Sequence, residues 1–234
     1  MKIAIKLLFA AVSIVLITAC GGGSSGGSTT VAPVASTSTF PLQTVVANYL
    51  QAQSQSYALS GVINGVAVTG SGTLTNGGLS AGNFEGASAL QRTTTITGTM
   101  VGNGVNIPLN SAVVGWFNSN YLPLGSTGGT DYVVVTGTAI IPSSVRINDT
   151  ATIYTATRYS NSTKQITQGT QTYSYVVEAD TSSTALLTLI SIDKNTFGTT
   201  TSTSSEQMRI TTSGTFVRTK DTALTSAGIL NITY

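Results

Sequence analysis

The chain has 234 residues, and only 8% of them are charged, against about 25% in typical soluble domains. The chain has ten Lys and Arg residues and eight Asp and Glu residues, so its formal net charge is +2, and it has no histidine. A chain without a basic field is not expected to bind nucleic acid. The lack of histidine removes Ser-His-Asp hydrolysis and the usual zinc sites. We therefore expect no enzyme activity, no metal site and no cofactor.

The first twenty residues have the pattern of a secretory signal. Lys2 and Lys6 precede an apolar run over residues 7–17, which is too short to span about 30 Å of hydrocarbon. The segment Leu16-Ile17-Thr18-Ala19-Cys20 closely resembles the lipobox of bacterial lipoproteins, with Ile where Leu is commoner. The resemblance implies that residues 1–19 are removed as a signal peptide and that Cys20 carries diacylglycerol and an acylated amino group. Palmitate is expected to be incorporated there. Two or three acyl chains anchor a protein firmly to a membrane.

This resemblance sets expectations for location and charge. In lipoproteins an Asp after the cysteine often retains the protein at the inner membrane, whereas this chain has Gly21. We therefore expect a lipid-anchored protein of the cell envelope at the outer membrane, facing the periplasm or the cell surface. Loss of Lys2 and Lys6 leaves eight basic and eight acidic side chains. Because the sole cysteine is lipidated, no disulfide is expected.

A tether and a helix follow. Residues 20–40 are rich in Gly and Ser, which predicts a flexible link between the lipid and the folded part. Residues 41–53 then carry an apolar stripe typical of an amphipathic helix, with Pro41 at its first position. The stripe consists of Leu42, Val45, Val46, Tyr49 and Leu50. A helix of this length is marginal alone in water, so we expect it to pack on a sheet.

Alternating patterns with turn signals predict β-hairpins next. Asn64-Gly65 separates two alternating runs, and a two-residue type I′ turn there pairs Ile63 with Val66. The same register pairs Gly61 with Val68, Leu59 with Gly70, and Tyr57 with Gly72. Asn103-Gly104 predicts a second hairpin between residues 96–100 and 105–109.

The rest of the chain also indicates short strands. They are expected at residues 132–141, 150–159, 170–179, 185–192, 207–217 (with a turn near Ser213-Gly214) and 229–234. The predicted fold class is mainly β: an antiparallel β-sandwich or a strongly curved meander, with one short N-terminal amphipathic helix. Residues 41–234 form either one β-rich domain or two halves, 41–128 and 129–234, divided at the loop expected over residues 126–129. The second half is similar to domains of uncharacterised proteobacterial lipoproteins, through residues 158–164 and 175–180, and this similarity implies no activity.

Two groups of residues are candidates for a site. Trp116, Phe117 and Tyr121 form either an aromatic platform for sugar or part of a core. Glu178 and Asp180 form either a carboxylate pair or, as we expect, a solvated strand end. The leading interpretation is a structural or interaction module with an unknown protein or glycan partner. The alternative is a ligand-binding module for carbohydrate or a small apolar molecule, which a large apolar cavity would favour.

Overall fold

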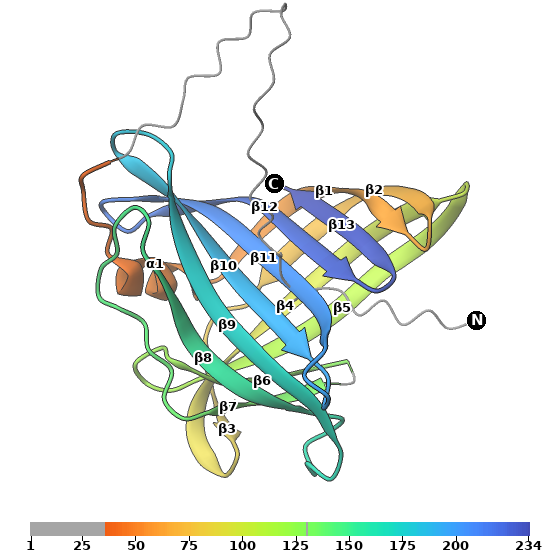
Figure 1. Ribbon diagram of the computed structural model, residues 1–234, viewed down its shortest axis with the longest axis horizontal. Helices are drawn as coiled ribbons and strands as arrows, with labels where there is room; N and C mark the ends of the chain where they lie inside the picture. The colour runs from red at the N-terminus through yellow and green to blue at the C-terminus, as the bar shows by residue number, and fades with distance from the viewer. Residues whose placement is uncertain (1–35, 130) are drawn as a thin grey trace, which may run out of the picture.

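The computed structural model describes residues 36–129 and 131–234, so Cys20, the signal peptide and most of the predicted tether lie outside the described residues. One helix and thirteen strands form in the described part (Figure 1). The elements are α1 (Leu42–Tyr49), β1 (Gln53–Ile63), β2 (Val66–Asn76), β3 (Ser80–Phe84), β4 (Ala87–Gly102), β5 (Val105–Phe117), β6 (Pro123–Gly128), β7 (Asp131–Thr136), β8 (Thr150–Tyr159), β9 (Thr167–Ala179), β10 (Thr184–Lys194), β11 (Thr200–Thr211), β12 (Phe216–Thr225) and β13 (Gly228–Thr233).

The strands close into an antiparallel barrel. Their order is β2-β1-β13-β12-β11-β10-β9-β8-β7-β6-β5-β4-β3, and β2 also pairs with β4. Twelve strands thus form a closed ring, and β3 is an extra strand on β4. The prediction of a β-sandwich or strongly curved meander was wrong, although the mainly β class was right. Local turn signals predict hairpins, whereas closure depends on the β1–β13 pairing between the two ends of the folded chain.

Strands from both parts of the chain belong to this one sheet. The segment expected as a loop over residues 126–129 instead contributes the end of β6 and its turn to β7. The sheet is continuous there, because Ser126 pairs with Val133 and Gly128 pairs with Asp131.

The first hairpin has the register expected from the sequence. Ile63 pairs with Val66 and Tyr57 pairs with Gly72. Asn64 and Gly65 have φ values of 49° and 78°, as a type I′ turn requires. The second hairpin is likewise confirmed, since β4 and β5 pair on either side of Asn103-Gly104.

Glycine allows β2 and β4 to approach each other closely where Gly72 pairs with Gly98. A Cβ on Gly72 would lie 2.0 Å from the carbonyl oxygen of Thr97 and 2.6 Å from the Tyr57 hydroxyl. The Tyr57 hydroxyl donates a hydrogen bond to that same oxygen at 3.3 Å. Gly72 therefore makes room both for the neighbouring backbone and for the tyrosine ring.

Helix α1 lies inside the curve of the barrel. Its side chains Leu42 and Val45 are fully buried against inward residues of β9, β10 and β11, including Val177, Leu187 and Ile210. It is shorter than the expected 41–53, because β1 already begins at Gln53. A second apolar cluster fills the part of the barrel formed by β1, β2, β4, β5 and β13. No helix within the described ranges has the length and apolar character needed to cross a membrane.

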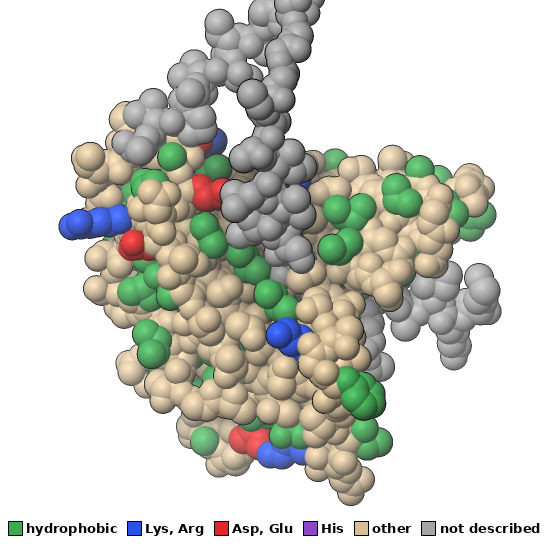
Figure 2. Space-filling model, viewed as in Figure 1, with side chains coloured by type: hydrophobic (Ala, Val, Ile, Leu, Met, Phe, Trp, Pro, Cys, Tyr) green, Lys and Arg blue, Asp and Glu red, His purple; other side chains and the backbone are tan. Residues whose placement is uncertain are grey.

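Much of the outer wall carries hydroxyl groups. In β1, β2 and β4 most inward residues are buried or half-buried, while most of the alternate residues are exposed, and the exposed ones are mostly Ser or Thr. Exposed members of this surface include Ser54, Ser56, Ser60, Thr69, Ser71, Thr93, Thr97 and Thr99. On the face that Figure 2 presents, hydrophobic and charged side chains are scattered and form no broad patch. Water solvates such a surface well.

Candidate ligand cavity

The barrel encloses a cavity of about 150 Å³ beside α1. Most of its wall is apolar. The apolar lining side chains are Val46, Leu50, Val113, Phe117, Pro123, Ile141, Ile153 and Leu189. A smaller set of polar side chains also lines it, among them Tyr49, Arg92, Tyr154, Gln171, Tyr173 and Ser191. An apolar chamber with a few polar groups is the usual form of a small-molecule site.

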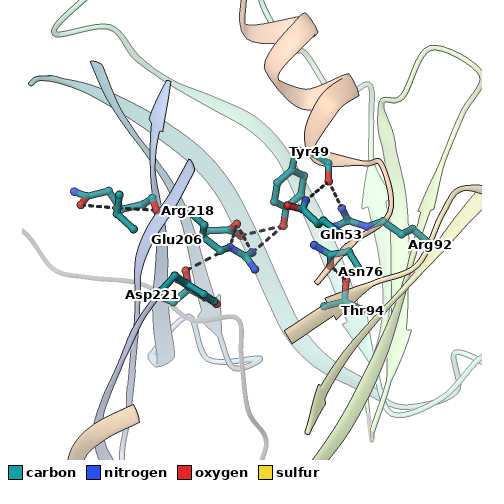
Figure 3. A network of polar contacts seen from close by, with 11 residues as sticks. Tyr49, Gln53, Asn76, Arg92, Thr94, Glu206, Arg218 and Asp221 are labelled. Carbon is teal, nitrogen blue, oxygen red and sulfur yellow. Dashed lines mark hydrogen bonds and ion pairs between the residues drawn. The ribbon is translucent and has the colours of Figure 1, made fainter. Parts of the chain in front are cut away.

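The end of α1 positions one side of the cavity. The Nη1 atom of Arg92, on β4, donates a 2.6 Å hydrogen bond to the main-chain carbonyl oxygen of Tyr49. Gln53 donates to the same oxygen at 3.1 Å. The Arg92 guanidinium also lies 4.5 Å from the centre of the Tyr49 ring, a cation–π contact. Arg92 thus caps the C-terminal end of the helix (Figure 3). It also belongs to the cavity lining.

A buried ion network lies at the far end of the Tyr49 ring. The Tyr49 hydroxyl donates to Glu206 Oε2 at 3.0 Å, and Arg218 donates to the other oxygen of Glu206 (Figure 3). Arg218 also lies 3.9 Å from Asp221, which accepts a hydrogen bond from the Tyr234 hydroxyl. This network fixes the ring of Tyr49 between two arginines.

A second polar network supports the other side of the cavity. The Tyr154 hydroxyl donates to Gln171, whose amide nitrogen donates to Asp193 at 3.1 Å. Asp193 is paired with Arg158 at 3.3 Å, and Arg158 also pairs with Asp131 at 3.0 Å. The buried carboxylate Asp193 is therefore already neutralised by an arginine.

The buried tyrosines of the cavity, Tyr49, Tyr154 and Tyr173, are neutral at physiological pH. Burial raises the pKa of Tyr49, Tyr154 and Tyr173, and nearby acidic or phenolic groups raise it further. They therefore bring no negative charge to the cavity lining.

One lining residue connects the cavity with the surface. Tyr121 is 36% exposed, whereas every other lining side chain is buried or half-buried. It has a φ of 63° in the loop between β5 and β6. That loop is held by Asn118, whose side-chain oxygen accepts from the main-chain nitrogens of Asn120 and Leu122. Tyr121 thus lies at the mouth of the cavity.

The structure separates the three aromatic residues singled out in the sequence. Phe117 and Tyr121 line the cavity. Trp116 points to the outer face and stacks on Phe84, with ring centres 5.4 Å apart and an interplanar angle of 21°. Phe84 in turn packs against Tyr132. The three residues do not form a single platform, because neighbours on a strand face opposite sides.

The carboxylates considered in the sequence have ordinary surface partners. Asp180 pairs with Arg209, and Glu178 accepts a hydrogen bond from Thr188. Across the described residues, no cluster of three or more Asp, Glu or Cys side chains is placed to hold a metal ion.

The sequence reasoning missed the polar interior. Arg92 shares its strand face with Ile96 and Met100, which are buried. A charged residue on the apolar face of an alternating strand is the signal that indicates a buried arginine. The partners Glu206 and Arg218 are harder to find, because their meeting with Tyr49 depends on the helix entering the barrel.

Comparison with known proteins places the chain in no group: no family model, no curated protein and no solved structure matches it significantly.

Proposed function

We propose that this protein is a lipid-anchored binding protein of the cell envelope, which holds a small, largely apolar molecule inside its barrel. The observation that carries the proposal is the cavity of about 150 Å³, with its mainly apolar wall and few polar groups. A purely structural module has no need of such a chamber, because protein interiors normally close-pack. The cavity therefore favours ligand binding over the structural interpretation.

The outer wall and the N-terminal sequence support the location. A barrel fold is compatible with the cell envelope or outer membrane. Barrels that span a membrane carry an apolar outward band about 25 Å tall, whereas the outward residues of β1, β2 and β4 are mostly Ser and Thr. We therefore propose attachment through lipid on Cys20.

The anchor is tested by removing the lipidated residue. Replacing Cys20 with Ser should release the protein from the membrane fraction and abolish incorporation of labelled palmitate. Unchanged partitioning into the membrane fraction would contradict the anchor.

The binding proposal is tested by filling the cavity. Ser191 lines it, is 1% exposed, and has a hydroxyl with no hydrogen-bond partner among the described residues. Ser191→Leu adds apolar volume there and removes an unsatisfied polar atom. In ligand-observed NMR with the full-length chain, we expect small aromatic probes to bind the unaltered protein and to bind this variant at least tenfold more weakly.

A matched control lies on the same strand. Thr188 is on the outward face of β10, so Thr188→Leu should leave binding of the probes unchanged. Failure of every probe to bind the unaltered protein would overturn the binding proposal. Equal loss in both variants would show that the probes bind elsewhere.

A further inference from the structure

We infer that the ligand of the cavity carries a carboxylate, and that Arg92 is its counter-ion. The inference rests on the proposed function, since it specifies the chemistry of the molecule that the cavity holds. It concerns a compact organic acid: an apolar body with one negative head group.

The environment of Arg92 differs from that of the other two buried arginines. Arg158 contacts Asp131 and Asp193, and Arg218 contacts Glu206 and Asp221. Arg92 is only 6% exposed, yet no carboxylate of the described chain lies within ion-pair distance of it. A buried charge without a counter-charge is costly, and an anion supplied by a ligand would remove that cost.

Arg92 also has donors to spare. A guanidinium carries five N–H donors, and among the described residues Arg92 uses them only on Tyr49, at its main-chain carbonyl oxygen and toward its side chain. The Tyr49 ring covers one face of the guanidinium, so the donors that Tyr49 does not use remain for a ligand. The planar fork of an arginine suits a carboxylate, which it can bind through two parallel hydrogen bonds.

Nothing else that lines the cavity competes for this cation. Tyr49, Tyr154 and Tyr173 are neutral, and Glu206 contacts the far end of the Tyr49 ring, where Arg218 already binds it. The wall beyond Arg92 is apolar, with Val113, Phe117 and Leu50 in the lining. The cavity therefore offers one cationic point and an apolar chamber.

The far wall supplies a polar contact. Arg92 lies on β4 and Ser191 on β10, and these strands are six places apart around the twelve-strand ring in either direction. The unpartnered hydroxyl of Ser191 thus lies across the barrel from Arg92. An apolar chamber of about 150 Å³ can hold a molecule the size of benzene. A ligand of about six to nine non-hydrogen atoms fits the space.

Benzoate and benzamide test this inference, because they have the same shape and differ in charge. We expect the full-length protein to bind benzoate at least tenfold more tightly than benzamide in titration calorimetry. Arg92→Gln should abolish the preference while leaving benzamide binding within about twofold. Arg92→Lys should keep part of the preference, since it keeps the charge but loses the fork.

Gln53 provides the control for the helix-capping role. Gln53→Ala removes the other hydrogen bond to the Tyr49 carbonyl and keeps the guanidinium, so the benzoate preference should persist. Benzamide binding as tight as benzoate binding would overturn the inference and leave the proposed function standing. Binding of neither probe would overturn both. The comparison of benzoate with benzamide binding to the unaltered protein tests the inference even if Arg92→Gln does not fold.

Discussion

The carboxylate of Glu206 and the guanidinium of Arg218 form a buried ion pair across β11 and β12, with side chains 6% and 4% exposed. The pair holds Tyr49 through hydrogen bonds from its hydroxyl to Glu206 and from Arg218 to its oxygen. It therefore links the barrel wall to the end of α1, and through α1 to the cavity.

Removal of one partner of this pair should be strongly destabilising. Arg218→Met leaves Glu206 buried without its cation, and breaking a buried pair in this way costs about 3–5 kcal/mol. Urea unfolding followed by circular dichroism should show the loss. The double variant Glu206→Gln with Arg218→Met should lose less than the sum of the two single variants.

An exposed ion pair provides the matched control. Arg209 pairs with Asp180, and the arginine side chain is 48% exposed. Arg209→Met should lower the free energy of unfolding by about 1 kcal/mol or less, because water screens the pair. Equal costs for the two arginine substitutions would contradict the buried arrangement of Arg218.

Asp221 should make stability depend on pH. Burial raises the pKa of Asp221 to about 7, although Arg218 opposes the shift. An unfolded Asp has a pKa of about 3.9. The folded state therefore binds more protons than the unfolded state between these values, so the stabilising contribution is complete below about pH 4 and is lost as the pH rises toward 7.

The measurement is urea unfolding at pH 4.5 and pH 7. Asp221→Asn should lessen the fall in the free energy of unfolding over this range, by at most about 1.4 kcal/mol per pH unit. The exposed carboxylate Glu178 serves as a comparison, and Glu178→Gln should leave the fall unchanged. A pH dependence identical in the wild type and Asp221→Asn would refute the assignment.

How much of this fold is predictable depends on the range of the interactions involved. The turn at Asn64-Gly65 is local, so the register of Tyr57 with Gly72 follows from the sequence. The pairing of β1 with β13 joins residues such as Leu59 and Ile232, far apart along the chain, and no local pattern indicates it. Closure into a barrel is not predictable from the sequence for that reason.

The same distinction applies to the cavity. Alternation along β4 shows that Arg92 lies on the buried face, but its partners depend on where α1 enters the barrel. The aromatic character of Phe117 marks it as a candidate and it does line the cavity, whereas its neighbour Trp116 faces outward. The cavity wall combines α1 with residues of β4, β5, β6, β8, β9 and β10, so only the closed fold assembles it.

The first turn should be sensitive to side-chain shape. Gly65 has a φ of 78°, and a Cβ added there would have nothing within 4 Å, so backbone strain limits the substitution and space does not. Gly65→Val should cost about 1–3 kcal/mol. Gly65→Asn should cost less, because Asn tolerates positive φ.

Gly77 is the comparison for this turn. It lacks a positive φ, and a Cβ there would lie 3.3 Å from the Thr93 carbonyl oxygen, a tight but adjustable contact. Gly77→Val should therefore be milder than Gly65→Val in denaturant unfolding. The reverse order would show that the strain at Gly65 does not govern the hairpin.

Trp116 should report on how β3 covers the outer wall. The Phe84 ring stacks on Trp116 and contacts Tyr132, and the Tyr132 hydroxyl donates to Glu85, which also binds Lys164. Phe84→Ala removes the cover from the only tryptophan of the chain. The fluorescence of Trp116 should shift to longer wavelength and be quenched more strongly by iodide, because water reaches the indole.

Phe197 provides the control. It is 90% exposed, so Phe197→Ala should leave the emission of Trp116 unchanged. Identical spectra for the wild type and Phe84→Ala would contradict the stacking of Phe84 on Trp116.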